Sequence, residues 1–265
     1  MEIIGFVLAI VMGFTLGLLG GGGSILTVPI LVYVLSINPV LATAYSLFVV
    51  GGTSVIGAWR KSSQNLVDWK TGLIFALPSL TAVFLTRYFL VPAIPAELFS
   101  LGEFVITRQV AIMVFFAIIM LLASYSMIKG RKEEQKQEEQ KPFNYPLILL
   151  EGALVGVVTG LVGAGGGFLI VPALVLLVRL PIKTAIGTSL VIISIKSLIG
   201  FLGDLGSGQD IDWIFLLSFT AFSAVGMFIG IYATKFIKAD ALKKGFGWFV
   251  LAMAIFILLK ETVLS

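Results

Sequence analysis

Two distant segments of this chain are versions of one another, and both interrupt an apolar run with glycines. Residues 13–31 read GFTLGLLGGGGSILTVPIL, and residues 156–174 read GVVTGLVGAGGGFLIVPAL. Consecutive glycines stop an α-helix, because each costs about 1 kcal/mol relative to alanine. In a very apolar chain, unwound backbone is tolerated only where it lines a cavity or is buried in protein. A glycine break repeated in both halves is typical of the binding site of a transporter.

The composition predicts an all-α integral membrane protein. Hydrophobic residues make up 58% of the 265 residues and charged residues only 12%, too little polar surface for a soluble globule. Apolar runs long enough for membrane-spanning helices recur along the chain, so the lipid bilayer is an expected partner. Without cysteine or histidine, disulfides and His-based metal sites are excluded, and we expect no cofactor. Basic residues gather at span ends, which indicates membrane orientation rather than nucleic-acid binding.

Each half has one organisation, a broken segment followed by three spans. The broken segments cover residues 3–36 and 145–178. The spans are expected at residues 40–59, 70–91, 109–128, 184–203, 212–234 and 245–260. The charged linker 129–142 divides a first transmembrane repeat, residues 1–128, from a second, residues 143–265.

The distribution of basic residues favours a re-entrant hairpin at each broken segment. With both segments re-entrant, one face keeps only Arg87, Arg108 and Lys260, and the basic linker lies on the other, cytoplasmic face with both termini external. Each half then has an odd number of full crossings, so the two repeats are inverted in the membrane. The alternative is that each broken segment crosses fully and that the repeats are parallel.

The glycine breaks are the first candidates for substrate binding. A half-helix that starts after each break directs free N–H groups and its positive dipole end toward the break, which suits an anion. The candidate residues are Gly20, Gly21, Gly22, Gly23, Ser24, Gly163, Ala164, Gly165, Gly166 and Gly167. The alternative is that the glycines only permit close helix packing, as expected for the pairs Gly13 with Gly17 and Gly156 with Gly160.

Polar residues predicted inside or at the ends of spans complete the candidate site. Lys196 is the only basic residue predicted well inside a span and is a candidate counter-charge to an anion, unless it snorkels toward the interface near Asp204. Hydroxyl groups on the spans that follow the breaks are candidates to solvate an oxyanion, or they make routine interhelical hydrogen bonds. These are Thr43, Ser46, Thr188 and Ser189.

Aspartates at the span ends are interpreted mainly as solvated charges. Asp68 and Asp212 are well placed for the positive end of the helix that follows each of them. For Asp204, a role in proton coupling is the alternative to a solvated charge.

The segments GLLGGGGSILTVPIL and GLVGAGGGFLIVPAL, each followed by an A-x-x-x-S-L pattern (Ala42–Leu47 and Ala185–Leu190), resemble the TauE/SafE family of sulfite exporters. The resemblance covers nearly the whole chain. It implies a carrier in the cytoplasmic (inner) membrane of a prokaryote, with substrates such as sulfite, thiosulfate, sulfoacetate and taurine-related anions. It also implies export rather than import.

We therefore expect a secondary transporter that exports a small anion, namely a sulfur oxyanion or organosulfonate. Its site would lie near the midplane between the glycine breaks and open to each side in turn. The alternative is an anion channel with paired re-entrant loops. An enzyme is disfavoured by the absence of His, Cys and paired carboxylates within a span. The sequence leaves a homo-oligomer possible.

Overall fold

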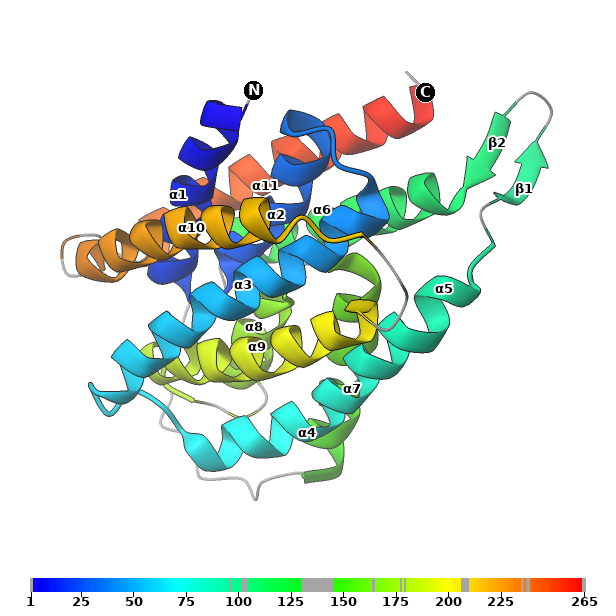
Figure 1. Cartoon of the computed structure of the whole chain (residues 1–265). Helices are drawn as coiled ribbons and strands as arrows, with labels where there is room; N and C mark the ends of the chain where they lie inside the picture. Colours follow the sequence, from blue (N-terminus) through cyan, green and yellow to red (C-terminus); the bar gives the residue numbers. More distant parts are fainter. Residues whose placement is uncertain are drawn as a thin grey trace.

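A computed structural model describes residues 2–95, 97–101, 104–129, 145–163, 165–176, 178, 180–205, 210–234, 236 and 239–263 (Figure 1). Most of the linker 129–142 and Ala164 lie outside these residues.

The first half begins with the broken segment that the glycines predict. Its elements are α1 (Glu2–Leu19), the 3₁₀ turn η1 (Gly22–Leu26), α2 (Thr27–Pro29) and the π-helical turn η2 (Ile30–Val34). The predicted spans follow as α3 (Pro39–Ser62), α4 (Trp69–Leu85) with its extension η3 (Thr86–Leu90) and α5 (Val91–Ala93), and α6 (Arg108–Lys129). Before α6 lies an antiparallel hairpin of β1 (Glu97–Leu101) and β2 (Phe104–Thr107), which the all-α prediction missed.

The second half repeats this order. Its broken segment is α7 (Tyr145–Val162) and α8 (Gly167–Leu176). The spans are α9 (Ile182–Leu205), α10 (Trp213–Ala233) and α11 (Ala239–Val263). Four described helical segments are long and apolar enough to cross a membrane, namely Pro39–Ser62, Trp69–Ala93, Lys183–Leu205 and Trp213–Ala233. The helical, membrane-spanning class of the fold is therefore confirmed.

The chain reverses direction at the first glycine break. Gly23 packs against the backbone of Met12 and Leu16, and the side chain of Leu35 reaches Gly5 near the start of α1. The segment after the break, which contains η1, α2 and η2, therefore runs back along α1. Figure 1 shows both in blue.

Helix α1 packs on α10 from the other half through its small residues. Gly13 lies against the carbonyl of Ser223, and Gly17 lies against Met227. Because the residue numbers rise together along the two helices, α1 and α10 are parallel. The close-packing role expected for this glycine pair is confirmed.

Helix α7 packs on α4 of the other half in the same way, through its glycines. Gly156 lies against the carbonyl of Ser79, and Gly160 lies against Val83 and Thr86. These helices are also parallel. The first helix of each half thus packs on the second span of the other half: α1 packs on α10, and α7 packs on α4. Each pair depends on a glycine face.

Helices α3 and α9 form the core of the molecule (Figure 1). In each, 72% of the apolar window is buried, against 39% in α4 and α10, so the outer pair supplies more of the lipid-facing surface. Gly51 of α3 lies beside Leu198, whereas Gly57 lies beside Leu190. Because one number rises as the other falls, α3 and α9 are antiparallel.

Two aspartates start the helices that follow this core, as predicted. Asp68 accepts a hydrogen bond from the Thr71 backbone N–H at 3.1 Å, and Asp212 accepts one from Phe215 N–H at 3.0 Å. Both are N-caps, which satisfy donors that a helix start leaves unpaired.

The connections into α4 and α10 are held by hydroxyl groups of the opposite half. The Asp68 N–H donates to Thr188 Oγ1 at 2.9 Å, and the Asp212 N–H donates to Tyr45 Oη at 2.7 Å. Tyr45 and Thr188 occupy matching positions in the two A-x-x-x-S-L patterns. This hydrogen bond occupies the Thr188 hydroxyl at the start of α4.

Candidate functional site

The two glycine breaks meet in the interior of the protein. The Cα atom of Gly21 packs against Gly167, so closely that neither position has room for a side chain. Several break residues have positive φ angles, a conformation that glycine adopts without a steric penalty. They are Gly20 at 67°, Gly21 at 146°, Gly163 at 70°, Gly165 at 64° and Gly166 at 68°.

Each break also rests on the core helix of the opposite half. Gly20 lies against Ile186 of α9, and Gly163 lies against Thr43 of α3. The Ser189 hydroxyl donates a hydrogen bond to the Gly20 carbonyl at 2.5 Å. Thr43 and Ser189, two of the predicted hydroxyl candidates, therefore contact the breaks.

Ser24 begins the segment after the first break. Its hydroxyl donates to the Gly21 carbonyl at 2.6 Å, and its N–H donates to the same oxygen at 3.2 Å. The segment that follows is a short helix, Gly23–Val34, as expected from sequence, and it begins in a 3₁₀ turn that includes Gly22 and Gly23. Ser46 of α3 is fully buried, and its hydroxyl has no hydrogen-bond partner among the described residues.

Lys196 is buried beside the second break. Its side chain is 0% exposed, and its Nζ donates to Thr159 Oγ1 at 3.1 Å. A Cβ atom at Gly166 would stand 2.7 Å from this Nζ, so the glycine leaves the space that the ammonium occupies. Within the described part of the chain, no carboxylate oxygen lies within 4.0 Å of Nζ. Lys196 therefore does not snorkel to the surface.

Arg87 is a second basic residue inside the fold, contrary to the sequence-based prediction. We expected Arg87 at an outer surface and Lys196 as the only basic residue well inside a span. The helical segment runs from Trp69 to Ala93 through the π-helical turn η3, close to the predicted span of residues 70–91, and Arg87 within it is 0% exposed. The apolar residues Tyr88–Val91, which follow Arg87 inside the predicted span, were the signal in the sequence that Arg87 lies within the span.

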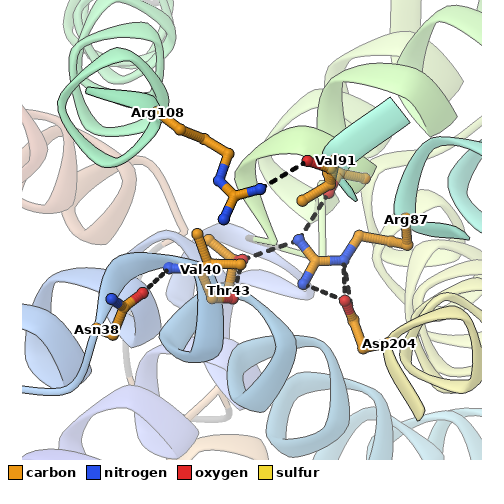
Figure 2. A network of polar contacts seen from close by, with 8 residues as sticks. Asn38, Val40, Thr43, Arg87, Val91, Arg108 and Asp204 are labelled. Carbon is orange, nitrogen blue, oxygen red and sulfur yellow. Dashed lines mark hydrogen bonds and ion pairs between the residues drawn. The ribbon is translucent and has the colours of Figure 1, made fainter. Parts of the chain in front are cut away.

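Asp204 is the partner of Arg87 (Figure 2). Arg87 Nη2 lies 2.6 Å from Asp204 Oδ1, and Nε donates to Oδ2 at 2.8 Å. Asp204 is 1% exposed, so the expectation of a solvated charge at this position was wrong. The sequence did not reveal the pair because its members are far apart in the chain.

Arg87 also reaches the region of the second break. Its Nη1 donates to Thr43 Oγ1 at 2.8 Å and to the Gly160 carbonyl at 3.2 Å, three residues before Gly163 (Figure 2). A single guanidinium thus joins α3, α7 and α9.

A cavity of about 470 Å³ is lined in part by this guanidinium. It is bounded by the start of α3, the end of α4 with α5, the start of α6 and the end of α9. The lining residues are Asn38, Val40, Leu41, Arg87, Val91, Pro92, Arg108, Gln109, Asp204 and Asp210. The cavity is therefore next to the contact region of the breaks and not between them, where the sequence predicted a site.

Comparison with known proteins supports a membrane transporter. The family model for the sulfite exporter TauE/SafE matches residues 5–257. A probable membrane transporter protein of Xylella fastidiosa (strain 9a5c) is 31% identical over 251 residues, which cover 93% of this chain and 90% of the relative.

Two further relatives carry the same kind of description. The probable membrane transporter protein YunE of Bacillus subtilis is 29% identical, over 80% of this chain and 82% of the relative. A probable membrane transporter protein of Haemophilus influenzae is 27% identical, over 94% of both chains. No solved structure matches the chain significantly. With its paired glycine breaks and a family match over almost its whole length, this chain belongs to the TauE/SafE sulfite exporter family, whose members are membrane transporters and not enzymes.

Proposed function

We propose that this protein is a secondary transporter that binds a small anion at the contact region of the two glycine breaks. The observation that carries the proposal is the position of Lys196, a fully buried ammonium beside Gly166 with Thr159 as its hydrogen-bond partner. A buried charge at membrane depth is costly without a partner, and such residues mark substrate or ion pathways. An anionic substrate would supply the missing negative charge.

The groups around Lys196 suit an oxyanion. An ammonium has three N–H donors, and the contact with Thr159 uses one of them. Backbone N–H groups at glycine turns and helix starts are further donors that suit an anion. The Ser46 hydroxyl of α3 is also buried without a hydrogen-bond partner among the described residues. We infer that the substrate's oxygens are bound by these donors and by Lys196 together.

We propose a sulfur oxyanion or an organosulfonate as the substrate and export as the direction. The family description supports this choice of substrate. Export of an anion also follows the electrical gradient, because a negative interior favours the exit of each charge by about 2.3 kcal/mol per 100 mV.

We further propose that the two halves are inverted repeats and that alternating access comes from movement of one against the other. Three arrangements support this. The matching helices α3 and α9 are antiparallel, and the chain reverses at Gly21. The first helix of each half packs on a helix of the other half, α1 on α10 and α7 on α4. A two-fold axis in the membrane plane relates such repeats in many transporters, with the substrate bound at the interface between them.

Replacing Lys196 with methionine should weaken anion binding by at least about tenfold. Lys196→Met removes the charge but keeps an unbranched apolar side chain, so the loss of a charge-assisted hydrogen bond, about 1.5–3 kcal/mol, dominates. Thermal-shift titrations with sulfite, thiosulfate, sulfoacetate and taurine measure the change, because a ligand of the folded state raises its stability.

Lys244→Met, at an exposed position of α11, is the matched control and should leave the thermal shift unchanged. Equal affinity in Lys196→Met and wild type would refute the proposed site. Large single-channel currents in planar bilayers would instead favour the anion-channel alternative.

Cysteine labelling tests the proposed topology directly, since the chain contains no cysteine. With a membrane-impermeant maleimide on intact cells, Glu2→Cys should react, whereas Lys136→Cys in the linker should react only after the cells are permeabilised. Reaction of neither position before permeabilisation would show that the first broken segment crosses the membrane fully.

A further inference from the structure

The cavity beside Arg87 has a second guanidinium in its wall. Arg108, at the start of α6, donates from Nη1 to the Ile94 carbonyl at 3.2 Å and to the Val91 carbonyl at 3.5 Å. These bonds hold the side chain against the end of α5, and Figure 2 shows it extending toward Arg87. Both arginines line the same cavity although they come from different helices.

The Arg108 guanidinium keeps an unused donor, whereas Arg87 is paired with Asp204. Arg108 Nε is buried and has no hydrogen-bond partner in the described structure. Arg87 Nη2 lies 2.6 Å from Asp204 Oδ1 and is therefore occupied by that carboxylate. A buried donor without an acceptor is destabilising, and more so when the group is charged. Arg108 Nε at this cavity is therefore costly to bury unless a ligand accepts a hydrogen bond from it.

The carboxylates at the cavity do not neutralise Arg108. Asp204 is engaged with Arg87, and Asp210 lies at the exposed rim. No carboxylate oxygen among the described residues lies within 4.0 Å of the Arg108 guanidinium. The neutral polar side chains Asn38 and Gln109 complete the polar part of the wall.

We propose that this cavity is a second anion site, a vestibule in which Arg108 and Arg87 bind the sulfonate or other oxyanion group of the substrate. The planar guanidinium offers paired N–H donors whose spacing matches two oxygens of an oxyanion. The choice of sulfur anions rests on the proposed function, but the existence of the vestibule rests on the two arginines and the cavity.

An anion in the vestibule would compete with Asp204 for Arg87. The same guanidinium donates to Thr43 and to the Gly160 carbonyl next to the second break. Exchange of Asp204 for the substrate would therefore loosen the contact that separates the vestibule from the glycine breaks. Arg87 then acts as a gate between the two sites.

Protection of an introduced cysteine tests the vestibule. Gln109→Cys places a thiol at an exposed position of the cavity wall in an otherwise cysteine-free chain. In the purified full-length protein, sulfoacetate should slow modification of this thiol by a bulky maleimide at least about threefold. Sulfoacetate is the probe because sulfite itself adds to maleimides. Ala93→Cys, an exposed α5 position outside the cavity lining, should show no protection.

Variants of Arg108 then test whether this arginine binds the anion that protects the thiol. In the Gln109→Cys background, Arg108→Gln should raise the sulfoacetate concentration for half-protection about tenfold, since it removes a charge-assisted interaction. Arg108→Lys keeps the charge and should have a smaller effect. Asp204→Asn should lower that concentration, because it releases Arg87 from its competitor.

The outcomes distinguish the vestibule from the central site, which is the proposed anion site beside Lys196. Absence of protection, or protection unaffected by Arg108→Gln, would overturn the vestibule, and the proposed function would stand if binding still depended on Lys196. Arg108-dependent protection without any Lys196-dependent binding would support the vestibule and overturn the central site.

Discussion

Gly21→Ala is expected to abolish anion transport and to destabilise the folded protein by about 3 kcal/mol. A methyl group at Gly21 would collide with the backbone of Gly167, and neither backbone can yield without displacing its break. The φ angle of 146° adds conformational strain for any residue with a Cβ atom. Overpacking costs about 1–3 kcal/mol and the strain costs a similar amount.

Transport into proteoliposomes and the midpoint of thermal unfolding in detergent measure these effects. Gly167→Ala tests the contact from the opposite side, because its Cβ atom would meet Gly21 and Ile193 at an ordinary helical position. Gly245→Ala is the matched control. No atom lies within 4 Å of a Cβ at Gly245, so alanine there should be neutral or slightly stabilising. Normal transport in Gly21→Ala would mean that the two breaks do not touch in the working protein.

Arg87→Met is expected to destabilise the protein by about 3–5 kcal/mol and to prevent transport. The substitution leaves the Asp204 carboxylate buried without its counter-charge, and losing one member of a buried ion pair costs this much. The hydrogen bonds that join α3 and α7 through the guanidinium are lost as well. Thermal unfolding followed by tryptophan fluorescence gives the change in stability.

The double variant Arg87→Met with Asp204→Leu distinguishes an ion-pair effect from a packing effect. Replacing both charges with apolar side chains removes the buried carboxylate, so the double variant should recover most of the stability lost in Arg87→Met. It should remain inactive, because the proposed gate is absent. Arg60→Met, at an exposed position of α3, is the control and should change stability by less than about 0.5 kcal/mol. A double variant no more stable than Arg87→Met would contradict this account.

Several features of the site were predictable because they depend on local chemistry. Consecutive glycines end a helix wherever they occur in an apolar run, so both breaks were found. The predicted spans agree with α3, α4, α6, α9, α10 and α11 to within a few residues at most ends, since apolar length reports membrane-spanning helices. Lys196 stood out because an ammonium within an apolar run needs an explanation.

The Arg87 site was not predictable in the same way. Arg87 lies near the end of an apolar run, where sequence alone favours an interfacial position. Its burial depends on the π-helical turn that extends α4 and on Asp204 from the other half of the chain. The hairpin of β1 and β2 was missed as well, because its short strands lie in what the sequence indicated only as a connection between spans.

The sequence by itself determined that this chain enters a membrane as a duplicated helical protein and that the glycine runs beginning at Gly20 and at Gly163 interrupt a helix in each half. Composition and glycine act locally, so their consequences do not depend on which segments later meet. Only the tertiary structure decided that Gly21 touches Gly167, that Lys196 fills the space beside Gly166, and that Arg87 pairs with Asp204. The Gly21–Gly167 and Arg87–Asp204 contacts join residues from opposite halves, whereas Lys196 and Gly166 both belong to the second half. None of these contacts is local in the sequence, so their geometry exists only once the helices have packed against each other.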